Sequence, residues 1–295
     1  MKASCPGKTV LLGEYAVLEQ GRAMVAAVSA RATGVRRGGL DLGSPVVREV
    51  RNHALKVGAT YRGGVAIHTD AFRDARAGKL GIGSSAATAI CTAALILGRG
   101  DDATFDVALA GHRAAAGGRG SGIDLRACFH GGVVVCSRQP GPVEAVPSHI
   151  PGLKLSVFHL GLSAKTAELI GTCKAAADWN RWVERLRDVS EAGIVAWRRG
   201  DADEFLKGVR AFVRAMEGLG ESAGIDLITE PGRQLRDAAE ALGGAAKPSG
   251  AGGGDVAVAW TRPEDAHALA ERVSARRLDL DVDPTGLRIE RPTEA

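Results

Sequence analysis

The chain has 295 residues, enough for two domains of ordinary size, and its 45% hydrophobic content excludes a disordered protein. Its 38 basic and 34 acidic residues give a net charge of +4 without long runs of one sign, which argues against nucleic-acid binding. No apolar run reaches the roughly 20 residues that span a bilayer, and the first residues lack an apolar stretch of signal-peptide length. We therefore expect a cytoplasmic protein with reduced, dispersed cysteines.

Branched residues in partial alternation, punctuated by Gly and Pro, predict strands in the first part of the chain. These predicted strands cover residues 9–18, 23–37, 45–52, 54–61 and 64–69. From Gly81 the pattern changes, and an alanine-rich run over 84–97 that ends at Gly98 predicts a buried helix. A second helix is expected over 103–116 and a strand over 131–137.

A proline-rich segment at residues 140–151 is the expected boundary between two domains, 1–152 and 153–295. In the second half we expect strands at 153–160, 256–260, 278–282 and 287–289, and helices around 205–216 and 231–242. A further helix is announced by Thr261 and Glu264 as a capping box. Strands interleaved with helices in both halves predict an α+β fold of two domains.

The first segment that points to chemistry is Lys79-Leu-Gly-Ile-Gly-Ser-Ser-Ala-Ala87. Its glycines allow a tight turn, and the N–H groups that follow lie at a helix N-terminus, which is a ready site for an anion. A plain glycine turn with a serine cap remains the structural alternative. The segment lacks the Lys of a Walker A loop, and its literal match to a dinucleotide fingerprint lacks the required strand context.

A second glycine-rich segment, residues 118–124, ends at Asp124 and leads into a strand-like stretch. A carboxylate presented by glycines is a candidate general base or positioning group, and a turn aspartate that bonds its own backbone is the alternative. A third segment runs from Lys247 to Asp255. Its Lys, Ser and Asp favour an anion-binding loop over a simple glycine hinge. Near the start, Lys8 follows Pro-Gly and precedes Gly13-Glu14-Tyr15.

In this order and spacing the segments resemble the GHMP kinase superfamily, with Pro-Gly-Lys at 6–8, Gly-Ile-Gly-Ser-Ser-Ala-Ala at 81–87 and Ser-Gly-Ala-Gly-Gly-Gly at 249–254. The resemblance implies an N-terminal ribosomal-protein-S5-like nucleotide-binding domain and a C-terminal ferredoxin-like domain. It also implies ATP, Mg²⁺ and phosphoryl transfer to a small molecule. Lys247 to Asp255 and Gly-Glu-Tyr-Ala-Val-Leu-Glu at 13–19 are most similar to phosphomevalonate kinases, which implies phosphorylation of 5-phosphomevalonate.

The resemblance also implies roles for particular residues. It makes Lys8 and Asp124 catalytic, assigns ATP to Lys79, Gly81, Ile82, Gly83, Ser84, Ser85 and Ala86 with Ser85 on the metal, and assigns the acceptor to Lys8, Glu14, Tyr15, Ser121, Lys165, Lys247, Ser249 and Gly250. Two departures from the family pattern stand out. Lys165 replaces a usual Ser, and the stretch around His112 lacks the magnesium-binding Glu of mevalonate kinases.

A phosphorylated acceptor is already mostly dianionic at pH 7, so it needs cations more than a base. We therefore expect Lys8 to matter more than Asp124. A mevalonate kinase or another small-molecule GHMP kinase is the first alternative, followed by a nucleotide-binding relative without turnover and a dinucleotide-dependent oxidoreductase. No membrane or nucleic-acid partner is expected, and the sequence leaves the oligomeric state open.

Overall fold

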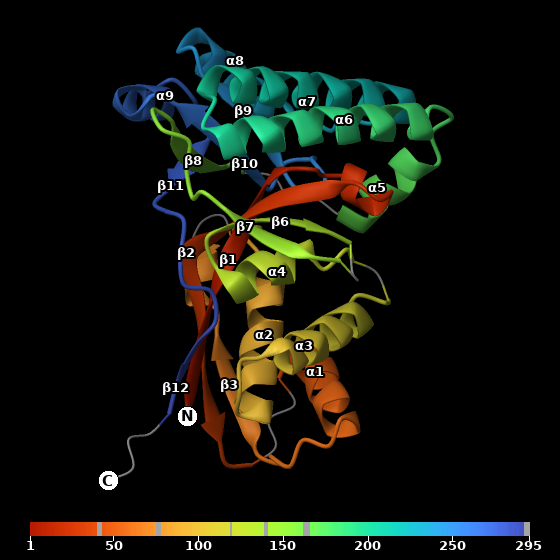
Figure 1. Ribbon diagram of the computed structural model, residues 1–295, viewed down its shortest axis with the longest axis vertical. Coiled ribbons are helices and arrows are strands. Elements are labelled where there is room, and N and C mark those ends of the chain that lie inside the picture. Colours follow the sequence, from red (N-terminus) through yellow and green to blue (C-terminus); the bar gives the residue numbers. More distant parts are fainter. Residues whose placement is uncertain (40–42, 75–77, 119, 139–140, 162–165, 292–295) are drawn as a thin grey trace. The chain divides into compact units, whose positions relative to one another are not determined.

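The computed structural model of the protein describes residues 1–39, 43–74, 78–118, 120–138, 141–161 and 166–291 (Figure 1). Its strands are β1 (Lys2–Leu12), β2 (Arg22–Arg37), β3 (Gly64–His68), β4 (Arg73–Asp74), β5 (Gly78–Lys79), β6 (Val133–Ser137), β7 (Val143–Val146), β8 (Lys154–His159), β9 (Ala245–Ser249), β10 (Val256–Thr261), β11 (Arg276–Leu278) and β12 (Arg288–Glu290). Its α-helices are α1 (Pro45–Lys56), α2 (Ser84–Leu97), α3 (Asp102–Ala115), α4 (Ile123–His130), α5 (Thr166–Lys174), α6 (Trp179–Arg199), α7 (Ala202–Ala223), α8 (Glu230–Ala241) and α9 (Ala266–Glu271). The predicted α+β class is confirmed.

The longer strands belong to two sheets. One sheet has the order β12-β1-β2-β6-β7 with β3 paired to β2, and the other has the order β11-β8-β10-β9. β12 runs antiparallel to β1 with Lys2 opposite Glu290, and β3 runs antiparallel to β2 with Thr33 opposite His68. The short strands β4 and β5 pair with each other in a separate ribbon.

The chain divides into two compact units, and both are discontinuous in sequence. Unit 1 comprises Met1–Lys8, Ala26–Val134 and Val282–Ala295, and unit 2 comprises Thr9–Val25 and Val135–Asp281. This division differs from the contiguous domains 1–152 and 153–295 expected from the sequence. The difference arises because β1 and β2 contribute residues to both units and the C-terminal segment belongs to unit 1.

In unit 1, helices α1, α2 and α3 cover one face of the strands (Figure 1). Residues 86–96 of α2 are all buried, which is why this helix is apolar all round. Close contact between α1 and α3 requires a residue without a side chain. A Cβ on Gly111 of α3 would lie only 2.4 Å from the Cα of Val50 on α1.

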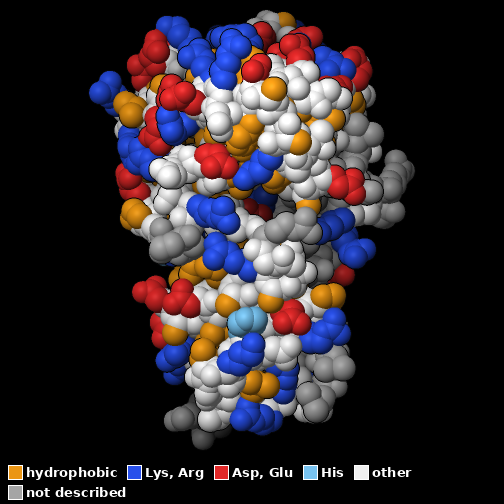
Figure 2. All heavy atoms as spheres, turned by 90° about the vertical axis from the view of Figure 1, so that its right-hand side faces the viewer, with side chains coloured by type: hydrophobic (Ala, Val, Ile, Leu, Met, Phe, Trp, Pro, Cys, Tyr) orange, Lys and Arg blue, Asp and Glu red, His pale blue; other side chains and the backbone are white. Residues whose placement is uncertain are grey.

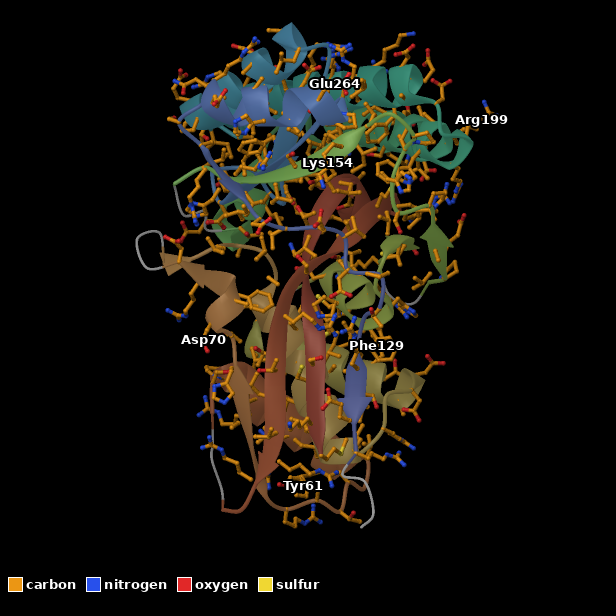
Figure 3. All side chains as sticks on the ribbon, turned by 90° about the vertical axis from the view of Figure 1, so that its left-hand side faces the viewer. Tyr61, Asp70, Phe129, Lys154, Arg199 and Glu264 are labelled. Carbon is orange, nitrogen blue, oxygen red and sulfur yellow. The ribbon has the colours of Figure 1, made fainter. Side chains whose placement is uncertain are left out.

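The C-terminal segment of unit 1 is attached by polar contacts. Asp283 forms an ion pair with Arg31, and the N–H of Leu287 donates to the carbonyl of Phe129 at 3.0 Å (Phe129 is labelled in Figure 3). Burial raises the pKa of Asp283, but the N–H of Thr285 and the Arg31 guanidinium outweigh that effect and hold it below its ordinary value. This carboxylate is therefore ionised at neutral pH.

Unit 2 packs its helices on the sheet β11-β8-β10-β9, and Figure 1 shows α6 and α7 side by side. Its core contains edge-to-face aromatic contacts, with ring centroids 5.1 Å apart for Trp197 and Phe205 and 5.0 Å apart for Phe205 and Trp260. Phe158 and Leu235 join the sheet to α8 in a second buried cluster. Many of the hydrophobic residues noted in the sequence are thus buried in the cores of the two units.

On the face drawn in Figure 2, Lys and Arg side chains are interspersed with Asp and Glu. This distribution agrees with a sequence whose charges are mixed along the chain. Within the part of the chain that the structure describes, no helix is both long enough and apolar enough to cross a membrane.

The strands expected over residues 45–52 and 54–61 are wrong, because α1 occupies most of that stretch. Ser44 caps the helix by accepting a hydrogen bond from the N–H of Val47, and a proline stands in its first turn. Val47, Val50 and Ala54 are buried at helical spacing. The frequent valines of the segment imitate a strand, whereas the positions at which they are buried follow a helix.

Other expected elements also differ. The strand expected over 278–282 is wrong, because β11 ends at Leu278 and only an isolated bridge at Val282 follows within that range. The first strand runs over Lys2–Leu12 rather than 9–18 and is followed by a 3₁₀ helix at Ala16–Leu18. The stretch after Gly122 is the helix α4, where a strand was expected. The capping box at Thr261 is wrong, since Thr261 is buried in β10 and α9 begins five residues later after a 3₁₀ turn.

Candidate active site

In unit 1 the first glycine segment forms a tight loop that leads into α2. Gly81 and Gly83 have φ angles of 73° and 90°, in the left-handed region that favours glycine. Gly83 is the N-cap of α2, so the helix N–H groups that lack intrahelical partners follow directly. The backbone N–H of Lys8 donates to the carbonyl of Ile82 at 2.8 Å. The positive end of α2 therefore lies beside β1 and Lys8.

Glycine is required on both sides of this contact. A Cβ on Gly83 would lie 2.8 Å from the Cγ of Lys8 and 3.2 Å from its backbone nitrogen. A Cβ on Gly7 would lie 2.5 Å from the carbonyl oxygen of Ile82. The two segments can approach this closely only because neither residue has a side chain.

Lys8 and Asp124 form an ion pair in which Nζ and Oδ2 are 3.4 Å apart. The Lys8 side chain is 11% exposed and the Asp124 side chain 38% exposed, so the carboxylate remains accessible to a ligand. Asp124 lies in the first turn of α4 behind Gly122, which has a φ of 85°. A carboxylate at this position interacts favourably with the helix dipole. The two residues that the sequence predicted to be catalytic thus lie together.

The loop that presents Asp124 is attached to α3. The guanidinium of Arg113 donates from Nε to the carbonyl of Gly120 and from Nη2 to the carbonyl of Ser121, both at 3.3 Å. Ser121 was predicted to contact the acceptor, and its carbonyl is engaged by Arg113. Arg113 was missed by the sequence analysis because its role depends on the packing of α3 beside this loop.

His112 lies within electrostatic reach of the ion pair. Burial lowers the pKa of His112 from its ordinary value of about 6.5. Asp124 opposes this shift, whereas Lys8 adds to it, so the imidazole is neutral at pH 7. The sequence indicated only that this stretch lacks a carboxylate. The structure adds an uncharged imidazole beside the predicted catalytic residues.

A cavity of about 260 Å³ opens at the N-terminus of α2. From α2 and the preceding β5, the residues that line it are Ser84, Ser85, Thr88 and Lys79, and the remaining lining residues are Ser44, Val46, Thr69, Phe72 and Arg73. The 3₁₀ turn that begins at Asp70, labelled in Figure 3, supplies part of this lining. The polar groups beside a helix N-terminus suit phosphates, and the half-buried Val46 offers an apolar contact for a base.

In unit 2 the third glycine segment begins at the end of β9 and turns away after Ser249. The Oγ of Ser249 accepts two hydrogen bonds, from the hydroxyl of Thr9 and the backbone N–H of Val10, both at 2.8 Å. Because a hydroxyl has one proton and two lone pairs, the proton of Ser249 remains for a third partner. Ser249 is therefore set up as a donor to an anionic or carbonyl oxygen.

The next two residues of the segment are bonded to Glu14 and Tyr15. The N–H of Gly250 donates to Oε1 of Glu14 at 3.1 Å, and the phenol of Tyr15 donates to the carbonyl of Ala251 at 2.5 Å. Burial raises the pKa of Tyr15, with further contributions from Cys173 and Glu14, so its hydroxyl stays a donor. Tyr15 has a φ of 62°, a strained value for a residue with a side chain. Strain of this kind is concentrated at functional sites.

Lys247 is fully buried in unit 2, contrary to the expectation that it contacts an acceptor. Its ammonium donates to Oε1 of Glu14 and to the carbonyl of Pro248, both at 2.5 Å, and lies 5.2 Å from the centre of the Phe212 ring. The exposed fraction of the Lys247 side chain is 0% and that of Glu14 is 4%. A buried charge must be paired in this way. The sequence identified both residues but could not show that they pair with each other.

Comparison with known proteins shows which families these features resemble. Residues 193–278 match the family described as GHMP kinases C terminal. Over 213 residues the chain is 32% identical to the phosphomevalonate kinase of Streptomyces sp. (strain CL190), and the alignment covers 61% of this chain and 57% of that protein. The chain is thus similar to GHMP kinases in its C-terminal part and to a phosphomevalonate kinase over 213 residues.

Two further proteins of the superfamily match over nearly the whole chain. The mevalonate kinase of Aeropyrum pernix is 26% identical, with 98% of each chain covered. The structure of Streptococcus pneumoniae phosphomevalonate kinase in complex with phosphomevalonate and AMPPNP has a TM-score of 0.83 at 19% identity, covering 96% of this chain and 99% of that one. This structural match confirms the predicted two-domain GHMP kinase fold.

Within the GHMP kinase fold, three of the predicted contacts need comment. Ile82 and Ala86 are 1% exposed, so their side chains are not available to a ligand. Lys165 lies outside the described residues.

Proposed function

We propose that this GHMP kinase transfers the terminal phosphoryl group of ATP to 5-phosphomevalonate and forms 5-diphosphomevalonate in the mevalonate route to isoprenoids. The observation that carries the kinase assignment is the Lys8–Asp124 ion pair beside the N-terminus of α2. The 32% identity to a phosphomevalonate kinase supports the choice of acceptor, although the alignment spans little more than half of that relative.

The proposal assigns the nucleotide to the cavity at α2. The free N–H groups that follow Gly83 would bind its phosphates, with the hydroxyls of Ser84 and Ser85 and the ammonium of Lys79 beside them. Thr69 and Arg73 would lie beside the nucleoside, and sequence reading missed them because Thr69 was counted as the end of a predicted strand and Arg73 follows it. A relative crystallised with AMPPNP supports this assignment.

The residues present fit a metal that arrives with the nucleotide. Among the described residues, no group of three His, Cys, Asp or Glu side chains is arranged to hold a metal ion. Mg²⁺ tolerates this arrangement because it keeps several waters and binds substrate phosphates through few protein ligands. Ser85 is the protein oxygen that we assign to it. When bound, Mg²⁺ would neutralise charge on the phosphates of ATP.

The chain's own residues would position the acceptor and neutralise the negative charge of the reacting phosphates. An acceptor phosphate monoester has a second pKa near 6, so its attacking oxygen is already deprotonated at pH 7. Asp124 has little proton to remove from it and serves mainly to orient Lys8. The ammonium of Lys8 offsets repulsion between the two anions as they approach. Ser249, with its unengaged proton, is the acceptor contact that the geometry favours most.

A mevalonate kinase is the second candidate, because the relative that matches over 98% of this chain carries that name. With a hydroxyl acceptor the chemistry changes. Asp124 would then act as a general base, a role worth about 10² to 10⁴ in rate. The two candidates thus make opposite demands on the same carboxylate.

A panel of acceptors tests the proposal. ADP release is measured with 5-phosphomevalonate, mevalonate, homoserine and galactose at equal ATP. We expect turnover with 5-phosphomevalonate to exceed that with every other acceptor by at least about tenfold in kcat/KM. Faster turnover of mevalonate would replace the proposal with the second candidate, and nucleotide binding without turnover would indicate a non-catalytic relative.

We also infer a cytoplasmic location, without a membrane or nucleic-acid partner. All five cysteines are buried as reduced thiols, which fits a reducing compartment. Mixed surface charge offers no single basic footprint on the face drawn in Figure 2.

A further inference from the structure

The buried ion pair of Lys247 and Glu14 is also bonded to the backbone of the third glycine segment. Oε1 of Glu14 receives both the ammonium of Lys247 at 2.5 Å and the N–H of Gly250 at 3.1 Å. Oε2 of the same carboxylate has no hydrogen-bond partner among the described residues. The observed polar contacts of Glu14 therefore run through one oxygen, which links Lys247 to the first residue after Ser249.

Gly250 is the point at which the backbone turns out of β9. Its φ is 105°, and apart from its chain neighbours no atom lies within 4 Å of the position that a Cβ would occupy. Steric contact with the surroundings therefore does not determine its conformation. The hydrogen bond to Glu14 is what fixes its N–H. Because Gly250 adjoins Ser249, this contact and the two hydrogen bonds to Oγ of Ser249 together hold the end of β9 in place.

Lys247 cannot serve an acceptor from its observed position. Its ammonium donates to Glu14 and to the carbonyl of Pro248, both in unit 2, and the ring of Phe212 lies 5.2 Å from it. Reaching a ligand would break the pair and leave the Glu14 carboxylate buried without its cation. Removing one partner of a buried pair is strongly destabilising for that reason.

We propose that Lys247 is a positioning residue: it acts through Glu14 to fix Gly250, and thereby holds the Ser249 hydroxyl in the orientation that donates to the acceptor. This inference rests on the proposed function and deepens it. It removes Lys247 from the set of acceptor contacts and leaves Ser249 as the contact that the pair serves.

The first test measures the accessibility of Lys247 in the wild-type enzyme. The free enzyme is treated with acetic anhydride, and modification of each lysine is followed by peptide mass spectrometry, with and without acceptor. Lys154 and Lys207 are internal references because their side chains are 49% and 66% exposed. We expect both references to react while Lys247 stays unmodified in either condition. Modification of Lys247 in the free enzyme, with protection by the acceptor, would overturn the inference.

The second test is a double-mutant cycle of Lys247→Met, Glu14→Gln and the combined variant, with Lys154→Met as a matched control on an exposed pair. Lys247→Met should lower kcat/KM for the acceptor by about 100-fold, the effect of a small misplacement near a reacting group. Affinity for a fluorescent ATP analogue should change less than twofold. The combined variant should regain at least about tenfold over Lys247→Met, because it leaves no unpaired buried charge.

The outcomes of these tests distinguish a failure of the inference from a failure of the proposed function. A combined variant no better than Lys247→Met would mean that the ammonium itself serves the acceptor, and it would overturn the inference. If Lys247→Met does not fold, the comparison of the combined variant with wild type takes its place, and a loss of 100-fold there has the same meaning. Absence of turnover by the wild type on every acceptor overturns the proposed function, and this inference with it. A modified Lys247 in an active enzyme overturns the inference alone.

Discussion

The backbone N–H of Lys8 donates to the carbonyl of Ile82 at 2.8 Å, which joins a strand from the start of the chain to the loop before α2. The bond fixes the main chain of Lys8, and the ion pair with Asp124 fixes its side chain. Lys8 is therefore held at both ends. A cation held in this way neutralises charge without further reorganisation, which is the physical basis of electrostatic catalysis.

Gly83→Ala should weaken nucleotide binding by at least about tenfold. The new Cβ would have to occupy a position 2.8 Å from the Cγ of Lys8, so either the strand or the loop must move. Gly58→Ala is the matched control, because Gly58 has a similar φ of 87° and open space around it. Both variants should lose about 1–2 kcal/mol of stability from the left-handed backbone. Titration with a fluorescent ATP analogue and urea unfolding provide the two measurements, and equal nucleotide affinities would contradict the prediction.

Lys8→Met should lower kcat more than Asp124→Asn. Removing the ammonium deletes the charge that faces the transferring phosphoryl group, an effect of about 10² to 10³ in kcat for one such donor. Asparagine keeps the shape of Asp124, and a dianionic acceptor needs no strong base. Steady-state kinetics with 5-phosphomevalonate measure both. An Asp124→Asn enzyme as slow as Lys8→Met would favour a hydroxyl acceptor.

Ser249→Ala should raise KM for the acceptor at least about 100-fold and leave KM for ATP unchanged, because the loss cannot be smaller than that of Lys247→Met, which acts through this hydroxyl. The variant removes the available proton and also leaves the N–H of Val10 without its partner, which costs about 1–3 kcal/mol. Ser156→Ala is a suitable control in the same unit, since the buried Oγ of Ser156 has no partner among the described residues. Its stability should be unchanged or higher. An acceptor KM that does not respond to Ser249→Ala would contradict the assignment of this residue.

His112 predicts a pH dependence of stability. Burial depresses the pKa of His112 in the folded state, so below about pH 6.5 the unfolded chain binds a proton that the folded chain resists. The free energy of unfolding should therefore fall as pH decreases from 6.5 toward the lowered pKa. His112→Asn should flatten this slope. Because burial also lowers the pKa of His130, the comparison is best made in a His130→Asn background, with urea unfolding at pH 5.5 and 7. An unchanged slope would be inconsistent with the buried neutral imidazole.

Local sequence signals predicted correctly those elements whose ends are marked by residues such as glycine. α2 was predicted from Ser84 to Leu97 because an alanine-rich core helix is flanked by glycines. α1 was misread because valines raise strand propensity, and only the neighbouring helices decide that Val47 and Val50 are buried on one helical face. The catalytic candidates were identified from motifs. The pairing of Lys247 with Glu14 could not be, because charges so distant in sequence meet only through tertiary packing.

The position of β12 in the sequence constrains when unit 1 can be completed during translation. β12 pairs with Lys2–Ser4 of β1, and Asp283 neutralises Arg31, so unit 1 acquires part of its framework from a segment that follows unit 2 in the chain. Domains generally fold as they emerge from the ribosome, the N-terminal one first. Here the strand that bears Lys8 emerges before Val135–Asp281 of unit 2, yet gains its outer neighbour β12 only after that segment. A ribosome-stalled chain that ends before residue 282 would expose that strand edge, and chaperone binding should be strongest at that length.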